Sequence, residues 1–385
     1  MPGEVIDRNE VIRLLSDLVR IPSVNPAMAG GTGEGRVAQY LGDRLRALGL
    51  CPAITEVEAG RPNVVITVPG KRGGPHIVFE AHTDTVPPSS DQVEPFTPRI
   101  EGDRLYGRGS CDTKASVAAM FAALASVLPV QERNATVSVA FTMGEELWHQ
   151  GAMHLVESGF RADMAVVGEP TGLSVVVAHK GALRWRMVTV GRSAHSSTPE
   201  EGCNAIVKMA AVIRALEGYM VPELRQRTHP LLGSPTLSIG LIQGGLQVNV
   251  IPDRCTIDLD RRTLPGESWE DVKAEVEAAM RPLRAEDPEL EVVVEEPYQR
   301  FGGMDTPADA PIARLAQEAL RRIDGQRPLR GVVYGTDAAE LSAAGMPSVI
   351  LGPGDIAQAH TSMEYVEIQQ VVKAAAIYRE IMLSA

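Results

Sequence analysis

The sequence HIVFEAHTDTV, residues 76–86, joins an apolar run to side chains that commonly bind metals. Residues 77–79 predict a buried strand, because Ile, Val and Phe favour β-structure and neither Gly nor Pro interrupts them. Side chains alternate between the faces of a strand, so His82 and Asp84 point the same way. An imidazole that binds a metal and a carboxylate that orients the ring form a recurrent pair. The simpler alternative is a strand-end histidine beside a turn-forming aspartate.

Helix and strand patterns alternate on both sides of this stretch. Apolar residues at helical spacing predict helices at residues 10–19, 37–48, 115–128 and 152–157. Apolar β-favouring runs predict strands at residues 63–68, 77–79, 136–141 and 164–167. Strands that alternate with helices indicate a mostly parallel sheet covered by helices, which is an α/β domain.

The pattern changes near Gly181. Strands of antiparallel type are expected at residues 183–190, 236–241, 254–259 and 290–294, with helices at 205–216 and 269–280. Alternation then resumes with a helix at 312–323, a strand at 348–351 and a terminal helix at 368–382. We therefore expect an α/β domain of residues 1–181 and 296–385, interrupted by an inserted α+β domain of residues 182–295.

The composition is that of an ordinary globular protein. The chain has 385 residues, of which 44% are hydrophobic and 22% charged. A formal net charge of -12 argues against nucleic acid as a partner. Apolar runs stay well short of the roughly 18 residues of a membrane span, so we expect no membrane partner. Four scattered cysteines and residues 1–5, which do not resemble a signal peptide, predict a cytoplasmic protein.

Four further stretches place ligand-type side chains at expected strand ends or in glycine-rich loops. These side chains are Asp112 in residues 107–114, Glu145 and Glu146 in 143–146, Glu169 in 167–170, and His360 in 351–360. Each has an ordinary alternative: a helix N-cap for Asp112, and a solvated turn or loop for the others. That alternative suits the adjacent glutamates least, because two like charges repel unless a positive charge lies nearby.

The clusters gain weight when they are taken together. Sites in doubly wound sheets form at the carboxyl ends of the strands, where these residues are expected. Two histidines and three carboxylates suit two divalent ions that share one bridging carboxylate, and one further carboxylate remains free to act as a base. Nitrogen and oxygen ligands without thiolate favour zinc, with cobalt or manganese as alternatives.

With these motifs the chain resembles the M20 family of dinuclear zinc hydrolases. That family includes acetylornithine deacetylases, succinyl-diaminopimelate desuccinylases, aminoacylases and carboxypeptidases. The resemblance covers essentially the whole chain. It rests on HTDTVP (residues 82–87), GRGSCDTK (107–114), GEE (144–146), GEPT (168–171) and the late His360.

The resemblance implies a role for each residue of the clusters. Asp112 would bridge the two ions, and the peptide bond that follows it would be cis. The other metal ligands would be His82 with Glu169 in one site, and Glu146 with His360 in the other. Glu145 would be the general base, and Asp84 would orient His82.

The insert resembles the family's lid and dimerisation domain. Residues 191–206, with His195, and residues 249–266, with Arg262, match its two halves. The resemblance implies a homodimer in which His195 reaches the partner's active site and stabilises the oxyanion. The ordinary alternatives are a surface-loop histidine and a solvated strand-end arginine.

Within the family the motifs are most similar to the acetylornithine deacetylase branch. We therefore expect an enzyme of amino-acid metabolism that hydrolyses an N-acyl amino acid or a short peptide. Candidate groups for the substrate carboxylate are Arg262, Lys180, Asn249 and Thr336.

Two departures from the family pattern leave alternatives open. Thr113 and Ala115 stand where many members have Met and Gly, and the bulky residues 148–150 follow the paired glutamates. The alternatives are a desuccinylase or aminoacylase, a di- or tripeptidase or carboxypeptidase, and a non-enzymatic binding protein on the same fold.

Overall fold

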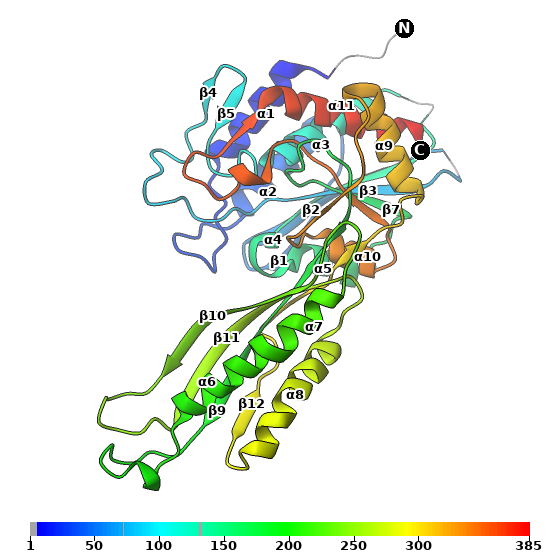
Figure 1. Ribbon diagram of the computed structural model, residues 1–385. Helices are drawn as coiled ribbons and strands as arrows, with labels where there is room; N and C mark the ends of the chain where they lie inside the picture. The colour runs from blue at the N-terminus through cyan, green and yellow to red at the C-terminus, as the bar shows by residue number, and fades with distance from the viewer. Residues whose placement is uncertain (1–5, 72, 131–132) are drawn as a thin grey trace. The chain divides into compact units, whose positions relative to one another are not determined.

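The computed structural model describes residues 6–71, 73–130 and 133–385 (Figure 1). Residues 1–5, which support the expectation of no signal peptide, lie outside these ranges. Among the helices described, none is long and apolar enough to cross a membrane. All four cysteines are free thiols.

The chain divides into two compact units. The first comprises Met1–Val177, Met304–Gly331 and Thr336–Ala385, and the second comprises Ala178–Gly303 and Val332–Gly335. These divisions differ by a few residues from the expected 181/182 and 295/296. Backbone pairing explains the shift, because residues 299–301 pair with the first strand of the insert and the Lys180 N–H donates to the Val332 carbonyl.

The first unit is built on a mixed sheet with the order β1-β2-β6-β3-β7-β16-β8-β14, and β15 pairs with β8. Its strands are β1 (Ala53–Glu58), β2 (Arg61–Val68), β3 (His76–His82), β6 (Thr136–Thr142), β7 (Met164–Val167), β8 (Val176–His179), β14 (Met304–Asp305), β15 (Arg330–Val332) and β16 (Ser348–Ile350). The central strands β6, β3, β7 and β16 are parallel, whereas β1, β2 and β8 pair antiparallel at the flanks. The predicted α/β class with a mostly parallel sheet is confirmed.

Helices cover both faces of this sheet (Figure 1). On one face lie α1 (Arg8–Arg20), α2 (Gly35–Ala47), α3 (Lys114–Val127), α9 (Pro311–Asp324) and α11 (Ile368–Ser384). The shorter helices are α4 (Glu145–Trp148), α5 (Gln150–Glu157), α10 (Ala338–Ala343) and the 3-10 turn η3 (Ile356–Gln358). The Ala-rich α3 is buried along nearly its whole length and packs against β3, α1 and α11, as its apolar sequence predicts.

A second, three-stranded sheet with the order β17-β5-β4 lies in the same unit. Its strands are β4 (Arg99–Glu101), β5 (Arg104–Tyr106) and β17 (Tyr365–Glu367). Each strand has only three residues, which is too short for an alternation pattern to predict it. This sheet joins the segment just before Asp112 to the segment just after His360.

The second unit has its own antiparallel sheet with the order β10-β11-β9-β12, and β13 pairs with β9. Its strands are β9 (Gly181–Val190), β10 (Thr236–Gly244), β11 (Arg254–Thr263), β12 (Glu291–Val294) and β13 (Gln299–Phe301). Its helices are α6 (Ala205–Ala215), α7 (Val221–Gln226) and α8 (Trp269–Glu286), with the short turns η1 (Pro199–Glu201) and η2 (Leu216–Met220). A separate core that includes the ring pair Trp185 and Trp269 makes this unit self-contained.

Candidate metal centre

The parallel strands bring the predicted ligands and the predicted base to one edge of the first unit's sheet. The side chains follow β3, β6, β7 and β16 or precede α3; they are His82, Asp112, Glu145, Glu146, Glu169 and His360. Carboxyl ends of parallel strands meet at the same sheet edge, which is why segments far apart in the chain converge there.

Asp112 lies between the two histidines. Its Oδ1 is 3.1 Å from Nε2 of His82, and its Oδ2 is 3.2 Å from Nε2 of His360. Each carboxylate oxygen therefore faces a different imidazole, which is the arrangement that a bridging ligand requires. The bond from Asp112 to Thr113 is cis, as the resemblance implies.

The remaining acids divide between the two histidines. His82 Nε2 lies 3.7 Å from Oε1 of Glu169 and 3.9 Å from Oε2 of Glu145. His360 Nε2 lies 3.1 Å from Oε2 of Glu146. His82 with Asp112 and Glu146, and His82 with Glu145 and Glu169, form two groups whose ligand atoms lie within 4.8 Å of one another.

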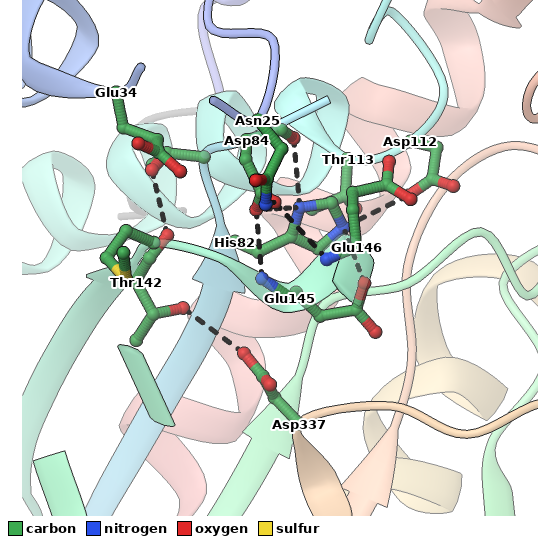
Figure 2. A network of polar contacts seen from close by, with 12 residues as sticks. Asn25, Glu34, His82, Asp84, Asp112, Thr113, Thr142, Glu145, Glu146 and Asp337 are labelled. Carbon is green, nitrogen blue, oxygen red and sulfur yellow. Dashed lines mark hydrogen bonds and ion pairs between the residues drawn. The ribbon is translucent and has the colours of Figure 1, made fainter. Parts of the chain in front are cut away.

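Asp84 connects His82 to the turn that contains the paired glutamates (Figure 2). Its Oδ1 is 3.3 Å from Nδ1 of His82 and accepts the backbone N–H of Glu145 at 3.0 Å. Its Oδ2 accepts the N–H of Glu146 at 3.2 Å and the side-chain amide of Asn25 at 2.8 Å. Asp84 therefore holds both the imidazole and the backbone of this turn.

Glycines before the acids let the backbone adopt these turns. Gly144 has φ 77, a left-handed value that favours glycine, and it immediately precedes the first turn of α4. Gly168 is needed for close packing instead, because an added Cβ would lie 2.6 Å from Cβ of Ser116 on α3. The loops after β6 and β7 can thus present Glu145 and Glu169 at the sheet edge.

Burial perturbs the acid–base properties of these groups. Burial raises the pKa of the Glu145 and Glu169 carboxyls well above their usual range, although the His82 charge opposes the shift. Burial and the Asp112 charge raise the pKa of Glu146 to about 7. Hydrogen bonds from Asp112 and Glu146 raise the pKa of His360 to about 10. Several buried carboxylates here cannot all be ionised without a compensating positive charge.

This donor set fits divalent cations. It combines two imidazole nitrogens with carboxylate oxygens, lies in a buried pocket of excess negative charge, and contains one carboxylate oriented toward both histidines. Imidazole and carboxylate ligands without thiolate suit zinc, cobalt or manganese.

Comparison with known proteins agrees with this chemistry. The family described as Peptidase family M20/M25/M40 matches residues 78–384. The chain belongs to this family. The predictions of an M20-type fold and of a metallohydrolase are thereby confirmed.

Relatives of this M20 chain include named deacetylases. It is 33% identical over 304 residues to the acetylornithine deacetylase of Myxococcus xanthus, which is 78% of each chain. It is 30% identical over 363 residues to the acetylornithine deacetylase of Vibrio parahaemolyticus, which is 92% of each chain.

Solved structures share the fold. Aminopeptidase PepT from Bacillus cereus superposes with a TM-score of 0.78 at 24% identity, covering 97% of this chain and 99% of that chain. The YXEP protein of Bacillus subtilis, described as a dinuclear metal binding peptidase from the M20 family, has a TM-score of 0.74 at 18% identity. That match covers 98% of this chain and 97% of the YXEP chain.

The M20 site also depends on a buried acid that the sequence patterns do not single out. Glu364 Oε1 accepts the N–H groups of Cys111 and Asp112, and its Oε2 accepts the N–H of Gly109 and the Arg108 guanidinium. The available signal is its position four residues after His360, in a loop otherwise lacking acids between Ala357 and Tyr365.

The predicted residues of the insert belong to the second unit. His195 is exposed and its Nδ1 lies 2.7 Å from the Ser197 hydroxyl. Arg262 pairs with Asp260 at 2.9 Å, and the Lys180 ammonium donates to the Ser234 carbonyl.

The other two candidates for the substrate carboxylate lie in different units. Asn249 is exposed in the second unit, whereas Thr336 is buried in the first and its hydroxyl accepts the Ala338 N–H. The convergence of ligands within the first unit therefore supports the metal centre, and the substrate-binding roles remain predictions.

Proposed function

We propose that the protein is a metal-dependent amidohydrolase that removes the acyl group from an N-acyl amino acid, as an acetylornithine deacetylase does. The observation that supports this proposal most strongly is Asp112, whose two oxygens face two different imidazoles beside the adjacent Glu145 and Glu146. The identity to named deacetylases supports the choice of an acyl amino acid as substrate.

Two divalent ions would occupy this centre, with zinc as the first choice and cobalt or manganese as alternatives. Asp112 would hold both ions. His82 and Glu169 would complete one site, and Glu146 and His360 would complete the other. When bound, such ions lower the pKa of a water molecule and polarise a substrate carbonyl.

Glu145 would move the proton during hydrolysis. Its Oε2 faces the His82 side of the centre, and its raised pKa suits a group that accepts a proton and later releases it. Glu145 would take a proton from the attacking water and deliver it to the leaving amine. Asp84 would keep His82 and the Glu145 backbone in register throughout.

The second unit would supply the remaining functions. We propose a homodimer, supported by β10, which is an edge strand with exposed apolar residues at Leu241 and Ile242. In that dimer His195 of one subunit would donate to the oxyanion formed in the other. Arg262 is the first candidate for the substrate carboxylate, because its planar guanidinium can form two parallel hydrogen bonds.

The other candidates, Lys180, Asn249 and Thr336, would contribute single hydrogen bonds to the substrate. We place the protein in the cytoplasm, a location that its free thiols favour.

A substrate panel tests the proposal. Zinc-loaded protein is offered N-acetyl, N-succinyl and N-formyl amino acids and dipeptides, with Glu145→Gln as the inactive control. N-acetylornithine is expected to give a higher kcat/KM than N-succinyl-diaminopimelate or any dipeptide. Faster cleavage of a succinyl or other acyl substrate would indicate a desuccinylase or aminoacylase. Faster dipeptide cleavage would indicate a peptidase, and metal binding without hydrolysis would indicate a binding protein.

A further inference from the structure

His149 occupies an unusual backbone position close to the centre. It links α4 to α5 with φ 52, in the left-handed region that few residues other than glycine adopt, and it is only 3% exposed. The protein therefore places a buried imidazole where a glycine would be less strained. An outlier of this kind beside a reactive site suggests that the side chain has a function.

The His149 ring lies between acids on two sides. Its Nε2 is 3.7 Å from Oε1 of Glu145. Its Nδ1 is 3.5 Å from Oε1 of Glu340 and 3.8 Å from Oδ1 of Asp337, both at the start of α10. Asp337 is itself fully buried and accepts from the Thr142 hydroxyl at 3.4 Å (Figure 2).

These contacts determine which Glu145 oxygen faces the metal centre. Oε1 faces His149, whereas Oε2 faces His82 at 3.9 Å. The backbone of Glu145 is held by Asp84, but its side chain has three rotatable bonds beyond that point. Catalytic hydrogen bonds are often long in the free enzyme and shorten when substrate binds, so a 3.7 Å separation is compatible with a positioning contact.

We propose that His149 is a positioning residue that holds the Glu145 carboxylate with Oε2 directed toward the metal centre. Asp337 and Glu340 hold the ring from its other side. This inference rests on the proposed function, in which Glu145 is the general base.

The left-handed backbone provides a sharp test. His149→Gly removes the ring and fits φ 52 without strain, and His149→Asn keeps a residue that tolerates this conformation. Glu94→Gly is the matched control, because Glu94 is an exposed residue with φ 47 outside the proposed machinery. Both His149 variants are expected to keep the melting temperature and the metal content of the wild type.

The kinetic expectation separates positioning from folding. The kcat of both His149 variants should fall by about 10- to 100-fold with KM changed little, because loss of a supporting contact lowers activity on this scale. Added imidazole should restore part of the kcat of His149→Gly, but not that of Glu145→Gln. Wild-type kcat in both His149 variants, or loss of metal in parallel with kcat, would overturn the inference.

A structural readout is independent of activity. In crystals of zinc-loaded His149→Gly the Glu145 carboxylate should leave its wild-type position, and an unmoved carboxylate would overturn the inference even if no substrate is found. Failure of the proposed function is recognised differently: wild-type protein would hydrolyse no acyl amino acid, or Glu145→Gln would stay fully active.

Discussion

The carboxylate of Glu364 accepts the backbone N–H of Asp112 at 3.1 Å across a sequence separation of 252 residues. The same carboxylate accepts the N–H of Cys111 at 2.9 Å, the N–H of Gly109 at 2.9 Å and the Arg108 guanidinium at 2.6 Å. Because Glu364 follows His360 closely, one buried acid joins the loop of the predicted bridging ligand to the loop of a predicted terminal ligand.

Glu364→Gln should weaken metal binding. The amide nitrogen that replaces one oxygen cannot accept a hydrogen bond, so some of these donors lose their partner. We expect metal affinity to fall by about 10- to 100-fold and the free energy of unfolding to fall by about 1–3 kcal/mol. Chelator competition and thermal melting measure the two effects. Glu367→Gln is the control, since that acid contacts Gln370 instead; equal affinities in both variants would contradict the prediction.

Adjacent Glu145 and Glu146 should have different functions. Glu146 Oε2 lies 3.1 Å from His360, whereas Glu145 lies between His82 and His149. Glu145→Gln should retain both ions and lose at least about a hundredfold in kcat, the usual scale for a general base. Glu146→Gln should release metal. Elemental analysis of the two purified variants decides the matter, and equal metal loss in both would show that the assignment is wrong.

Metal affinity should rise with pH. Hydrogen bonds from Asp112 and Glu146 raise the pKa of His360 to about 10, so below that pH the metal-free ring holds a proton that an ion must displace. Affinity should therefore rise by about tenfold per pH unit for each proton released. The ion pair of the metal-free protein has the opposite trend: its stabilisation is full below the unfolded pKa of 6.5 and is lost as pH rises through about 10.

Calorimetry in buffers of different ionisation enthalpy counts the protons released on zinc binding. His360→Asn should release fewer protons than the wild type. His76→Gln serves as the control, because His76 lies at the opposite end of β3 and contacts Ser138. A proton count unchanged in His360→Asn would exclude His360 from the metal centre.

Mixed dimers should recover activity if His195 acts on the partner's site. His195→Ala should lose about 2.7–4 kcal/mol of transition-state stabilisation, as other oxyanion donors do, and Glu145→Gln should be nearly inactive. After subunit exchange, one site of each mixed dimer combines an intact Glu145 with an intact His195. Activity should approach one working site per mixed dimer. No recovery, with heterodimers confirmed by mass spectrometry, would place His195 in its own subunit's site or outside catalysis.

Local sequence pattern predicts most of the helices and strands. Residues 164–167 are predicted as a strand and form β7 with the same bounds, and the predicted helix 115–128 differs from α3 by one residue at each end. These segments are long or strongly apolar, so burial and backbone preference agree. The three-residue strands β4, β5 and β17 are not predicted, because pairing between distant segments stabilises them.

The types of ligand residue, their positions at strand ends and their M20 pattern can be recognised from the linear sequence, because strand-end loops are local features. Their convergence cannot. Asp112 meets His360 because β3, β7 and β16 are neighbours in the sheet and because Glu364 holds both loops.

The role proposed for His149 is equally non-local. Sequence comparison marks the residue only as a departure from the family pattern, whereas its approach to Glu145 requires the left-handed link between α4 and α5 and the acids at the start of α10. Contacts between segments so far apart depend on strand order and helix packing, which a local pattern of side chains does not encode.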